Sequence, residues 1–414
     1  MHRFAHISDV HLGSQREKFM RDLEVEKFRL AIDMCIEEKV DFVVIAGDLF
    51  HNNVPPMQIL NEAIATLTKL TKRGIPIYMV YGSHDFSHDT VGAVDILETA
   101  GIIRNVSASQ ERVFTSDPGT GALLAGISGR KIGLEKAEFE NLAREEMQSA
   151  TGFRIFVFHS AISEFKPPDL ADMESIEISY FPRGFSYYAG GHVHRRGEYD
   201  FPGYDKIVFP GSLYLGWQSE DISRIFKGER RGFYVVDFDS EVRNVRFVPL
   251  PEFAGIQIEV NLQGFNSAEA SRELQDRILQ ARFSQKAVLV RVYGTLSGGK
   301  TSDINFGEIR KICLQKGATH FMLDRFGLRT EEMVRFTAAG NTVQEIEQNV
   351  LRENLGNFKT NLEDISGERG IKLATALLQI FRAEKLEDEK ENSYSLRIVE
   401  ESLKTLGLNQ GGEK

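Results

Sequence analysis

Histidine and aspartate side chains follow five apolar segments in the first half of the sequence, each where a strand is expected to end. The segments are FAHISDVHLG, VVIAGDLFH, YMVYGSHD, FVFHS and YYAGGHVH. Open α/β sheets bind ligands outside the carboxyl ends of their strands, so the five segments are predicted to converge on one crevice. They supply the side chains of Asp9, His11, Asp48, His51, Ser83, His84, Asp85, His159, His192 and His194.

These residue types indicate a metal site. Imidazole and carboxylate ligands without thiolate suit Mn, Fe or Zn. The pairs Asp9/His11 and His192/His194 are each separated by two residues, a spacing that points both side chains of an extended chain to one side. The candidates suffice for two ions, which together can activate water for displacement at phosphorus. One such segment alone is more often structural, but five in this order favour a dinuclear site.

The elements that must position these side chains alternate between strand and helix patterns over the first 250 residues, which is typical of a layered α/β domain. A helix is predicted after the first strand from the helical spacing of Val25, Phe28, Ile32, Cys35 and Ile36. A second is predicted after Pro55 and Pro56, with an apolar stripe of Met57, Leu60, Ile64 and Leu67. Strands are predicted in RFAHI, DFVVIA, IPIYMV, ALLAGI, FRIFVF, SYYAG, KIVFPG, GFYVVDF and VRNVRFVPL. The short apolar run DFVVIA is typical of a buried strand.

Two further regions follow the first domain, which is assigned to residues 1–251. The pattern of residues 252–332 has the order β-α-β-α-β, which predicts a small α/β cap. His320 in this cap is interpreted as a structural strand residue. Residues 333–414 are predicted to be helical, with a charged linker at 384–393. The final helix carries Leu396, Val399, Leu403 and Leu406, and it either packs on its own domain or docks in a partner's groove.

Composition narrows the class of protein. The net charge is −10, so the overall charge of the chain does not indicate nucleic-acid binding. Bound cations, however, can make the local charge at a binding site positive. The basic stretch RIFKGERRG is interpreted as a solvated hairpin. No apolar run approaches the roughly 18 residues of a membrane span, and the N-terminus enters a strand at once without a leader pattern. Only Cys35 and Cys313 occur, which favours a reducing, intracellular compartment.

The order of these motifs resembles the calcineurin-like metallophosphoesterase superfamily. HISDVHLGSQ, AGDLFH with its trailing His51, GGHVHRR and FPGSLYLGW narrow the resemblance to DNA double-strand-break repair nucleases of the meiotic-recombination-eleven and SbcD family. The resemblance implies a β-sandwich flanked by helices, followed by a small α/β capping domain and a helical C-terminal region. It also implies Mn-dependent cleavage of DNA phosphodiesters by a homodimer that works with an SMC-like coiled-coil ATPase of the SbcC type.

The resemblance also assigns roles to single residues. It implies that one ion is held by Asp9, His11, Asp48 and His194, and the other by Asp48, His159 and His192, so that Asp48 bridges. It makes His84 the acid or transition-state stabiliser and His51 the residue that positions the phosphate. The helix bearing the Met57–Leu67 stripe is expected to help build the dimer, although a core-facing helix explains the stripe nearly as well.

Ser83 departs from the family pattern, in which asparagine supplies a neutral metal ligand. A serine hydroxyl is shorter by about one bond of roughly 1.2 Å, so it is expected to reach the ion through water or not at all. The second metal is therefore predicted to be held more weakly. Asp85 is interpreted as orienting the loop or His84 rather than as a ligand.

The leading hypothesis is a Mn-dependent DNA nuclease with two ions per chain. One alternative is a small-molecule metallophosphoesterase, such as a cyclic-nucleotide phosphodiesterase, which needs the same metal core. His51 and the extra domains favour a larger substrate. The other alternative is a non-catalytic scaffold for DNA ends or for the ATPase, with the second metal site impaired at Ser83.

Overall fold

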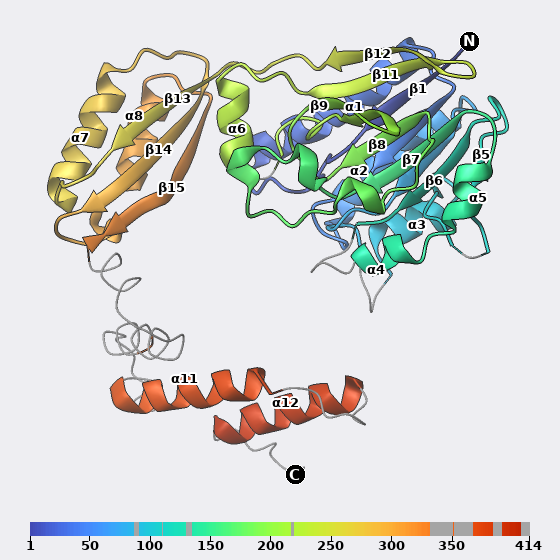
Figure 1. The fold of residues 1–414 in the computed structure, drawn as a ribbon. Helices are drawn as coiled ribbons and strands as arrows, with labels where there is room; N and C mark the ends of the chain where they lie inside the picture. Colours follow the sequence, from blue (N-terminus) through green and yellow to red (C-terminus); the bar gives the residue numbers. More distant parts are fainter. Residues whose placement is uncertain are drawn as a thin grey trace. The chain divides into compact units, whose positions relative to one another are not determined.

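The computed structural model describes residues 1–86, 91–109, 111–129, 135–216, 219–331, 351, 367–383 and 391–406. Its first 250 residues build two six-stranded sheets (Figure 1). The first sheet runs in the order β12 (Val242–Pro249), β11 (Gly232–Phe238), β1 (His2–Ile7), β2 (Phe42–Ala46), β3 (Ile77–Val80) and β4 (Arg104–Asn105). The second runs in the order β5 (Thr115–Ser116), β6 (Leu123–Ile127), β7 (Arg154–His159), β8 (Tyr187–Gly191), β10 (Tyr204–Phe209) and β9 (Gly197–Phe201).

Parallel pairing dominates the centre of both sheets. Strands β1 to β4 pair in parallel, as do β6, β7, β8 and β10. The edge strands β5, β9 and β12 pair antiparallel with their neighbours. The predicted strands are confirmed as strands, whereas β4, β5 and β9 were not predicted because they are short or carry mostly polar residues.

Each central strand is buried on both faces, which explains its continuous apolar sequence. In β2, Val44 packs into a core between the two sheets, while Val43 and Ile45 face the opposite side. In β7, Val157 enters the same core between the sheets, while Phe156 faces outward to a third core. The two sheets therefore form a sandwich with an apolar layer on each outer face, and the predicted β-sandwich flanked by helices is confirmed.

Helices cover the outer faces. The core outside the first sheet includes side chains of α1 (Lys18–Glu37), α2 (Met57–Thr71) and α3 (Ala93–Thr99). The core outside the second sheet includes side chains of α4 (Glu135–Glu140) and α5 (Arg144–Ser149). The remaining elements of this half are α6 (Ser219–Phe226), η1 (Ser163–Phe165), η2 (Pro168–Leu170) and η3 (Ile178–Tyr180).

The predicted dimer stripe on α2 faces mainly inward. Leu60 and Leu67 are buried in the core shared with α1, and Ile64 packs against that core. Only Met57 is exposed, at 76%. The alternative of a core-facing helix is therefore confirmed for Leu60, Ile64 and Leu67, because a helix on a sheet must bury its apolar face against that sheet. A dimer contact at α2 stays a prediction.

A three-stranded sheet follows, in the order β13 (Gly255–Asn261), β14 (Ala287–Leu296) and β15 (His320–Thr330). Helix α7 (Ser267–Gln280) follows β13, while η4 (Thr301–Asp303) and α8 (Phe306–Gln315) follow β14, so the predicted β-α-β-α-β order is confirmed. The chain divides into two compact units. The first holds Met1–Gln257, Phe283–Leu289 and Leu314–Met322, and the second holds the described remainder of the chain. The boundaries 1–251, 252–332 and 333–414, and a capping role, stay predictions.

The described part of the C-terminal region holds the helices α11 (Gly367–Phe381) and α12 (Glu391–Thr405). Helix α12 begins at Glu391, so the predicted linker 384–393 is too long by three residues, because polar residues can form the first turn of a surface helix as well as a linker. Residues 384–390 lie outside the described part of the chain. No helix that the structure describes is long and apolar enough to cross a membrane.

Truncating Phe42 should destabilise the sandwich. Its side chain is fully buried between the sheets and stacks on Phe4 with ring centroids 5.2 Å apart. Phe42→Ala is expected to lower the free energy of unfolding by about 3–5 kcal/mol, measured by urea denaturation. The same exchange at Phe326, which is 94% exposed, should cost about 0.5 kcal/mol or less. Equal losses for the two variants would contradict this assignment of the core.

Candidate metal centre

The structure brings the strand-end side chains together at the carboxyl ends of five strands. The segments after β1, β2 and β3 supply residues from the first sheet, and β7 with the segment after β8 supplies residues from the second. Among the described residues, three groups have ligand atoms that all lie within 4.8 Å of one another: Asp9, His11 and His194; Asp9, Asp48 and His159; and His11, His51 and His84. The predicted convergence on one crevice is therefore confirmed.

Asp48 lies at the centre of the cluster and is only 2% exposed. Its Oδ2 lies 3.1 Å from His159 Nε2 and 3.5 Å from His11 Nε2, two residues that come from different sheets. Burial alone would favour the neutral carboxyl, but His159 and His11 outweigh it and hold the pKa of Asp48 well below its usual range. Asp48 therefore offers an ionised carboxylate to both sides of the candidate site.

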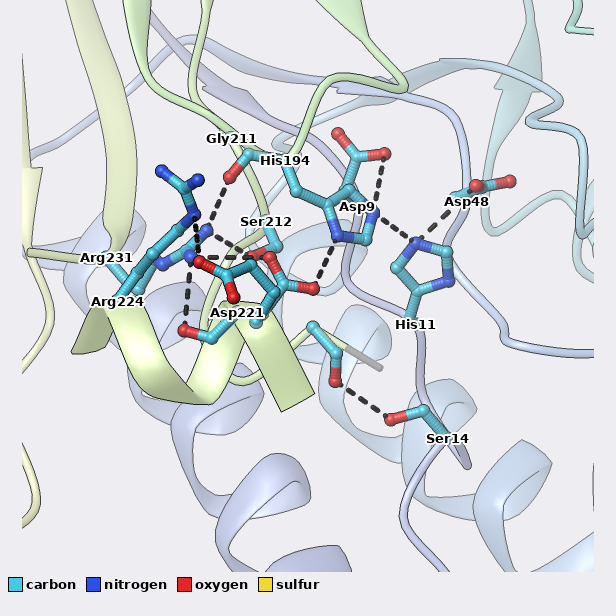
Figure 2. Close-up of polar contacts among 12 residues, drawn as sticks. Asp9, His11, Ser14, Asp48, His194, Gly211, Ser212, Asp221, Arg224 and Arg231 are labelled. Carbon is cyan, nitrogen blue, oxygen red and sulfur yellow. Dashed lines mark hydrogen bonds and ion pairs between the residues drawn. The ribbon is translucent and has the colours of Figure 1, made fainter. Parts of the chain in front are cut away.

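His11 and His194 face each other beside Asp9 (Figure 2). Their Nε2 atoms lie 2.9 Å apart, and His194 Nε2 lies 3.8 Å from Asp9 Oδ1. Two imidazole nitrogens directed at one point next to a carboxylate form a donor set that suits a borderline divalent cation.

Two of these imidazole rings are oriented by hydrogen bonds at Nδ1, the ring nitrogen that points away from the cluster. His159 Nδ1 lies 2.8 Å from the carbonyl oxygen of Ala46, and His194 Nδ1 lies 2.9 Å from Asp221 Oδ2. A ring that donates through Nδ1 directs Nε2 into the site, as metal-binding histidines commonly do. The residues present therefore fit divalent cations.

His192 and Ser83 are placed beside this cluster rather than within its closest groups. Both line a cavity of about 540 Å³ together with Asp48, His84 and His194. The backbone N–H of His192 donates to Asp9 Oδ1 at 3.0 Å, and its ring lies 5.2 Å from that of His159. Burial lowers the pKa of His192 to about 3, so its ring is neutral and able to bind a cation.

The backbone is strained at four residues whose side chains are candidate metal ligands. Asp9, His11, Asp48 and His192 have φ angles of 49°, 51°, 52° and 82°, in the left-handed region that ordinary residues avoid. Such residues cost of order 1–3 kcal/mol each and persist only where the surroundings hold them. Gly82 shows how tightly they are held, because a Cβ there would lie 2.0 Å from Asp48 Oδ1.

Asp85 ties two of the loops together. It is 2% exposed and accepts hydrogen bonds from the backbone N–H groups of Leu49, Phe50 and Gly82. Burial, with the nearby Asp48 charge, raises the pKa of Asp85 to about 7. These contacts support the interpretation of Asp85 as a residue that orients the loop.

The backbone of His84 donates to Asp48 Oδ1 at 2.8 Å, and its Nδ1 lies 2.8 Å from the carbonyl oxygen of His51. The rings of His51 and His84 stack with centroids 5.0 Å apart. The His84 ring is thus fixed at the wall of the cavity.

Sequence reasoning missed Asp221 and Arg231, which both form hydrogen bonds with His194 (Figure 2). Asp221 lies on α6 and accepts from His194, and Arg231 lies 3.4 Å from Asp221 Oδ1 and donates to the carbonyl oxygen of His194. Arg231 is only 3% exposed, so the expectation of a solvated hairpin is wrong for this residue. A buried carboxylate compensates its charge, and no local pattern in the sequence signals that partner.

Cation binding should release a proton from His159. Burial lowers the pKa of this ring, but Asp48 outweighs burial and raises it to about 10, so the ring is protonated at about pH 7.5. Metal ligation requires the neutral ring, so Mn²⁺ affinity should rise with pH up to this pKa. The released proton is taken up by the buffer, so the binding enthalpy measured by calorimetry should depend on the buffer. The values in HEPES and in Tris should differ by the difference between the two buffers' ionisation enthalpies, multiplied by about one proton. His159→Asn should remove that difference, and identical heats for the unmodified protein would contradict the ion pair.

Comparison with known proteins agrees with this geometry. Residues 2–196 match the family model described as calcineurin-like phosphoesterase. The chain is 31% identical over 305 residues to DNA double-strand break repair protein Mre11 of Thermoplasma acidophilum, covering 70% of this chain and 77% of that protein. It is 30% identical over 288 residues to the protein of that name from Methanocaldococcus jannaschii, covering 64% and 71%. For the Archaeoglobus fulgidus protein of that name the identity is 28% over 281 residues, covering 62% of this chain and 59% of its relative. The chain belongs to the Mre11 family of calcineurin-like phosphoesterases.

Proposed function

We propose that the chain is a metal-dependent DNA nuclease that processes double-strand breaks. The observation that carries the proposal is the buried Asp48 carboxylate, which lies between imidazoles of both sheets at the carboxyl ends of the strands. The relatives are named as DNA double-strand break repair proteins, which supports DNA as the substrate. The chain spans 59% of the Archaeoglobus fulgidus relative, so its activity and partners are proposed here.

Two Mn²⁺ ions per chain are proposed as cofactors. Asp9, His11, Asp48 and His194 would hold one, and Asp48, His159 and His192 would hold the other. The short contacts of Asp48 with His11 and His159 support its bridging role. When bound, such a pair of cations activates water and offsets charge that develops on the phosphoryl group. Ser83 lines the cavity with a short hydroxyl side chain, so the second ion is proposed to be held more weakly.

His84 is proposed to donate a proton to the departing oxygen, and His51 to position the phosphate. His84 lines the cavity, and its contact with the carbonyl oxygen of His51 fixes which ring nitrogen faces the substrate. The stacked ring of His51 lies beside it and near His11, within 5.8 Å between centroids. Both rings would therefore meet the same phosphate.

The proposed partners are DNA, a second copy of the chain and an SMC-like coiled-coil ATPase of the SbcC type. Helices α11 and α12 expose Phe381 and Val399 by more than half, which supports docking of a partner on this region. Met57 is the exposed end of the α2 stripe and is the part still available to a dimer contact. The proposed location is the cytoplasm, at the nucleoid.

His84→Gln should abolish most of the cleavage while leaving ligand binding intact. Glutamine keeps a hydrogen-bonding amide but cannot transfer a proton, so kcat on linear duplex and single-stranded DNA with Mn²⁺ should fall roughly 10²- to 10⁴-fold. Mn²⁺ binding and DNA binding, measured by calorimetry and by fluorescence anisotropy, should stay close to those of the unmodified protein.

His2→Gln is the matched control, because His2 is a partly exposed residue at the start of β1 and should leave kcat unchanged. A loss of Mn²⁺ affinity in His84→Gln would instead make His84 a ligand. An unmodified protein that leaves both DNA forms intact while hydrolysing a small phosphodiester would overturn the choice of DNA as substrate.

Ser83→Asn should tighten the second metal. The longer side chain brings an amide oxygen toward the ion, so the Mn²⁺ concentration for half-maximal cleavage should fall on the order of tenfold. Ser149→Asn, an exposed site on α5, should leave it unchanged. An unaltered Mn²⁺ dependence in Ser83→Asn would mean that residue 83 does not touch this ion.

A further inference from the structure

Glu24 is a buried carboxylate that belongs to none of the candidate ligand groups. It lies on the inner side of α1 and is only 4% exposed. Its Oε2 accepts the backbone N–H of Gly13 at 2.7 Å, and its Oε1 accepts the hydroxyl of Ser14 at 2.6 Å. Both donors lie in the loop that follows His11.

Burying this carboxylate is unfavourable in itself. Burial raises the pKa of Glu24 to about 7, against hydrogen bonds from Ser14 and Gly13 that favour the charged form. An apolar side chain would avoid this cost but would leave the Gly13 N–H and the Ser14 hydroxyl without their acceptor. The presence of a carboxylate here is therefore explained by the loop that it holds.

That loop fixes the position of His11. The N–H of Ser14 donates back to the carbonyl oxygen of His11 at 3.0 Å, and the N–H of His11 donates to the carbonyl oxygen of Asp48 at 3.0 Å. His11 itself has a φ of 51°, a conformation that its surroundings must enforce. Glu24 thus holds the far side of the turn whose near side carries a candidate ligand.

The same contacts continue to the segment before α6. Gln15 Nε2 lies 2.9 Å from the Ser14 hydroxyl and 2.9 Å from the carbonyl oxygen of Gly216, and it can donate one proton to each. Ser14 Oγ also lies 3.2 Å from that carbonyl oxygen. Glu24, Ser14 and Gln15 therefore connect α1 to Gly216 by hydrogen bonds.

Gly216 in turn abuts the residue that orients His194. It has a φ of 65°, and a Cβ at this position would lie 2.3 Å from Asp221 Oδ2. That same oxygen lies 2.9 Å from His194 Nδ1. A shift of Gly216 would therefore displace the Asp221 carboxylate and turn the imidazole that it holds.

We infer that Glu24 is a positioning residue of the metal centre, which places His11 through the Gly13–Ser14 turn and His194 through Gly216 and Asp221. The inference rests on the proposed metal site but concerns residues outside it. Glu24 would therefore help to place both histidines of the candidate ligand group formed by Asp9, His11 and His194.

The test is a double-mutant cycle on Mn²⁺ affinity, measured by calorimetry on the full chain without DNA. Glu24→Ala should weaken the first Mn²⁺ site roughly tenfold or more, as loss of outer support commonly does. Ser14→Ala should have a similar effect, and the double variant should lose little beyond either single variant, because one network is removed. Glu24→Gln should restore affinity, since its amide can accept from Gly13 and donate to Ser14.

Glu26→Ala is the matched control, because Glu26 lies on the same helix with a side chain that is 67% exposed, and it should bind Mn²⁺ like the unmodified chain. Unchanged affinity in folded Glu24→Ala, or additive losses in the cycle, would overturn the inference. The imidazole N–H resonance of His194 in metal-free, ¹⁵N-histidine protein gives a second readout. It should shift in Glu24→Ala and Ser14→Ala and return in Glu24→Gln, and an unmoved signal overturns the inference. A protein that binds no Mn²⁺ would refute the proposed cofactor, while this resonance would still decide the role of Glu24.

Discussion

The contact of Asp48 with His11 and His159 is the constraint on which the rest of the structure depends. A carboxylate that is 2% exposed stays ionised only where positive or polar groups surround it, and here they come from both sheets. The spacing of the two sheets must therefore keep His11 and His159 in contact with Asp48. The tightly packed aromatic and aliphatic core between the sheets supplies that spacing, so the core is part of the site's geometry.

Backbone strain adds a second constraint on the same region. Candidate ligands with positive φ angles are held by neighbours that leave no room for adjustment, as the close approach of Gly82 to Asp48 shows. Around them lie buried carboxylates that belong to none of the candidate ligand groups among the described residues. Asp85 joins two loops, and Asp221 orients the ring of His194 by a hydrogen bond. Glu24 accepts a hydrogen bond from the turn that follows His11. The rigid placement that metal ions require thus comes from a shell of acidic side chains at helices and turns.

Much of the sandwich and most of the candidate site could be predicted from the sequence. Strands such as β2 and β7 are largely apolar. Asp48 follows the end of β2 by two residues, and His159 is the last residue of β7. The α2 stripe was harder to interpret, because an apolar face looks the same whether it covers a sheet or a partner. Arg231 was misread for a related reason. A basic residue in a charged stretch looks solvated until a buried carboxylate from another element is placed beside it.

The sequence by itself determined which residue types stand at the strand ends, and hence the chemistry and the family of the protein. Those signals are local, since strand periodicity and ligand spacing extend over only a few residues. Tertiary structure alone decided that Asp221 hydrogen-bonds to His194 and that Glu24 holds the turn beyond His11. Such contacts depend on how sheets and helices pack, because a single buried carboxylate on a helix carries no periodic pattern that could reveal its partner.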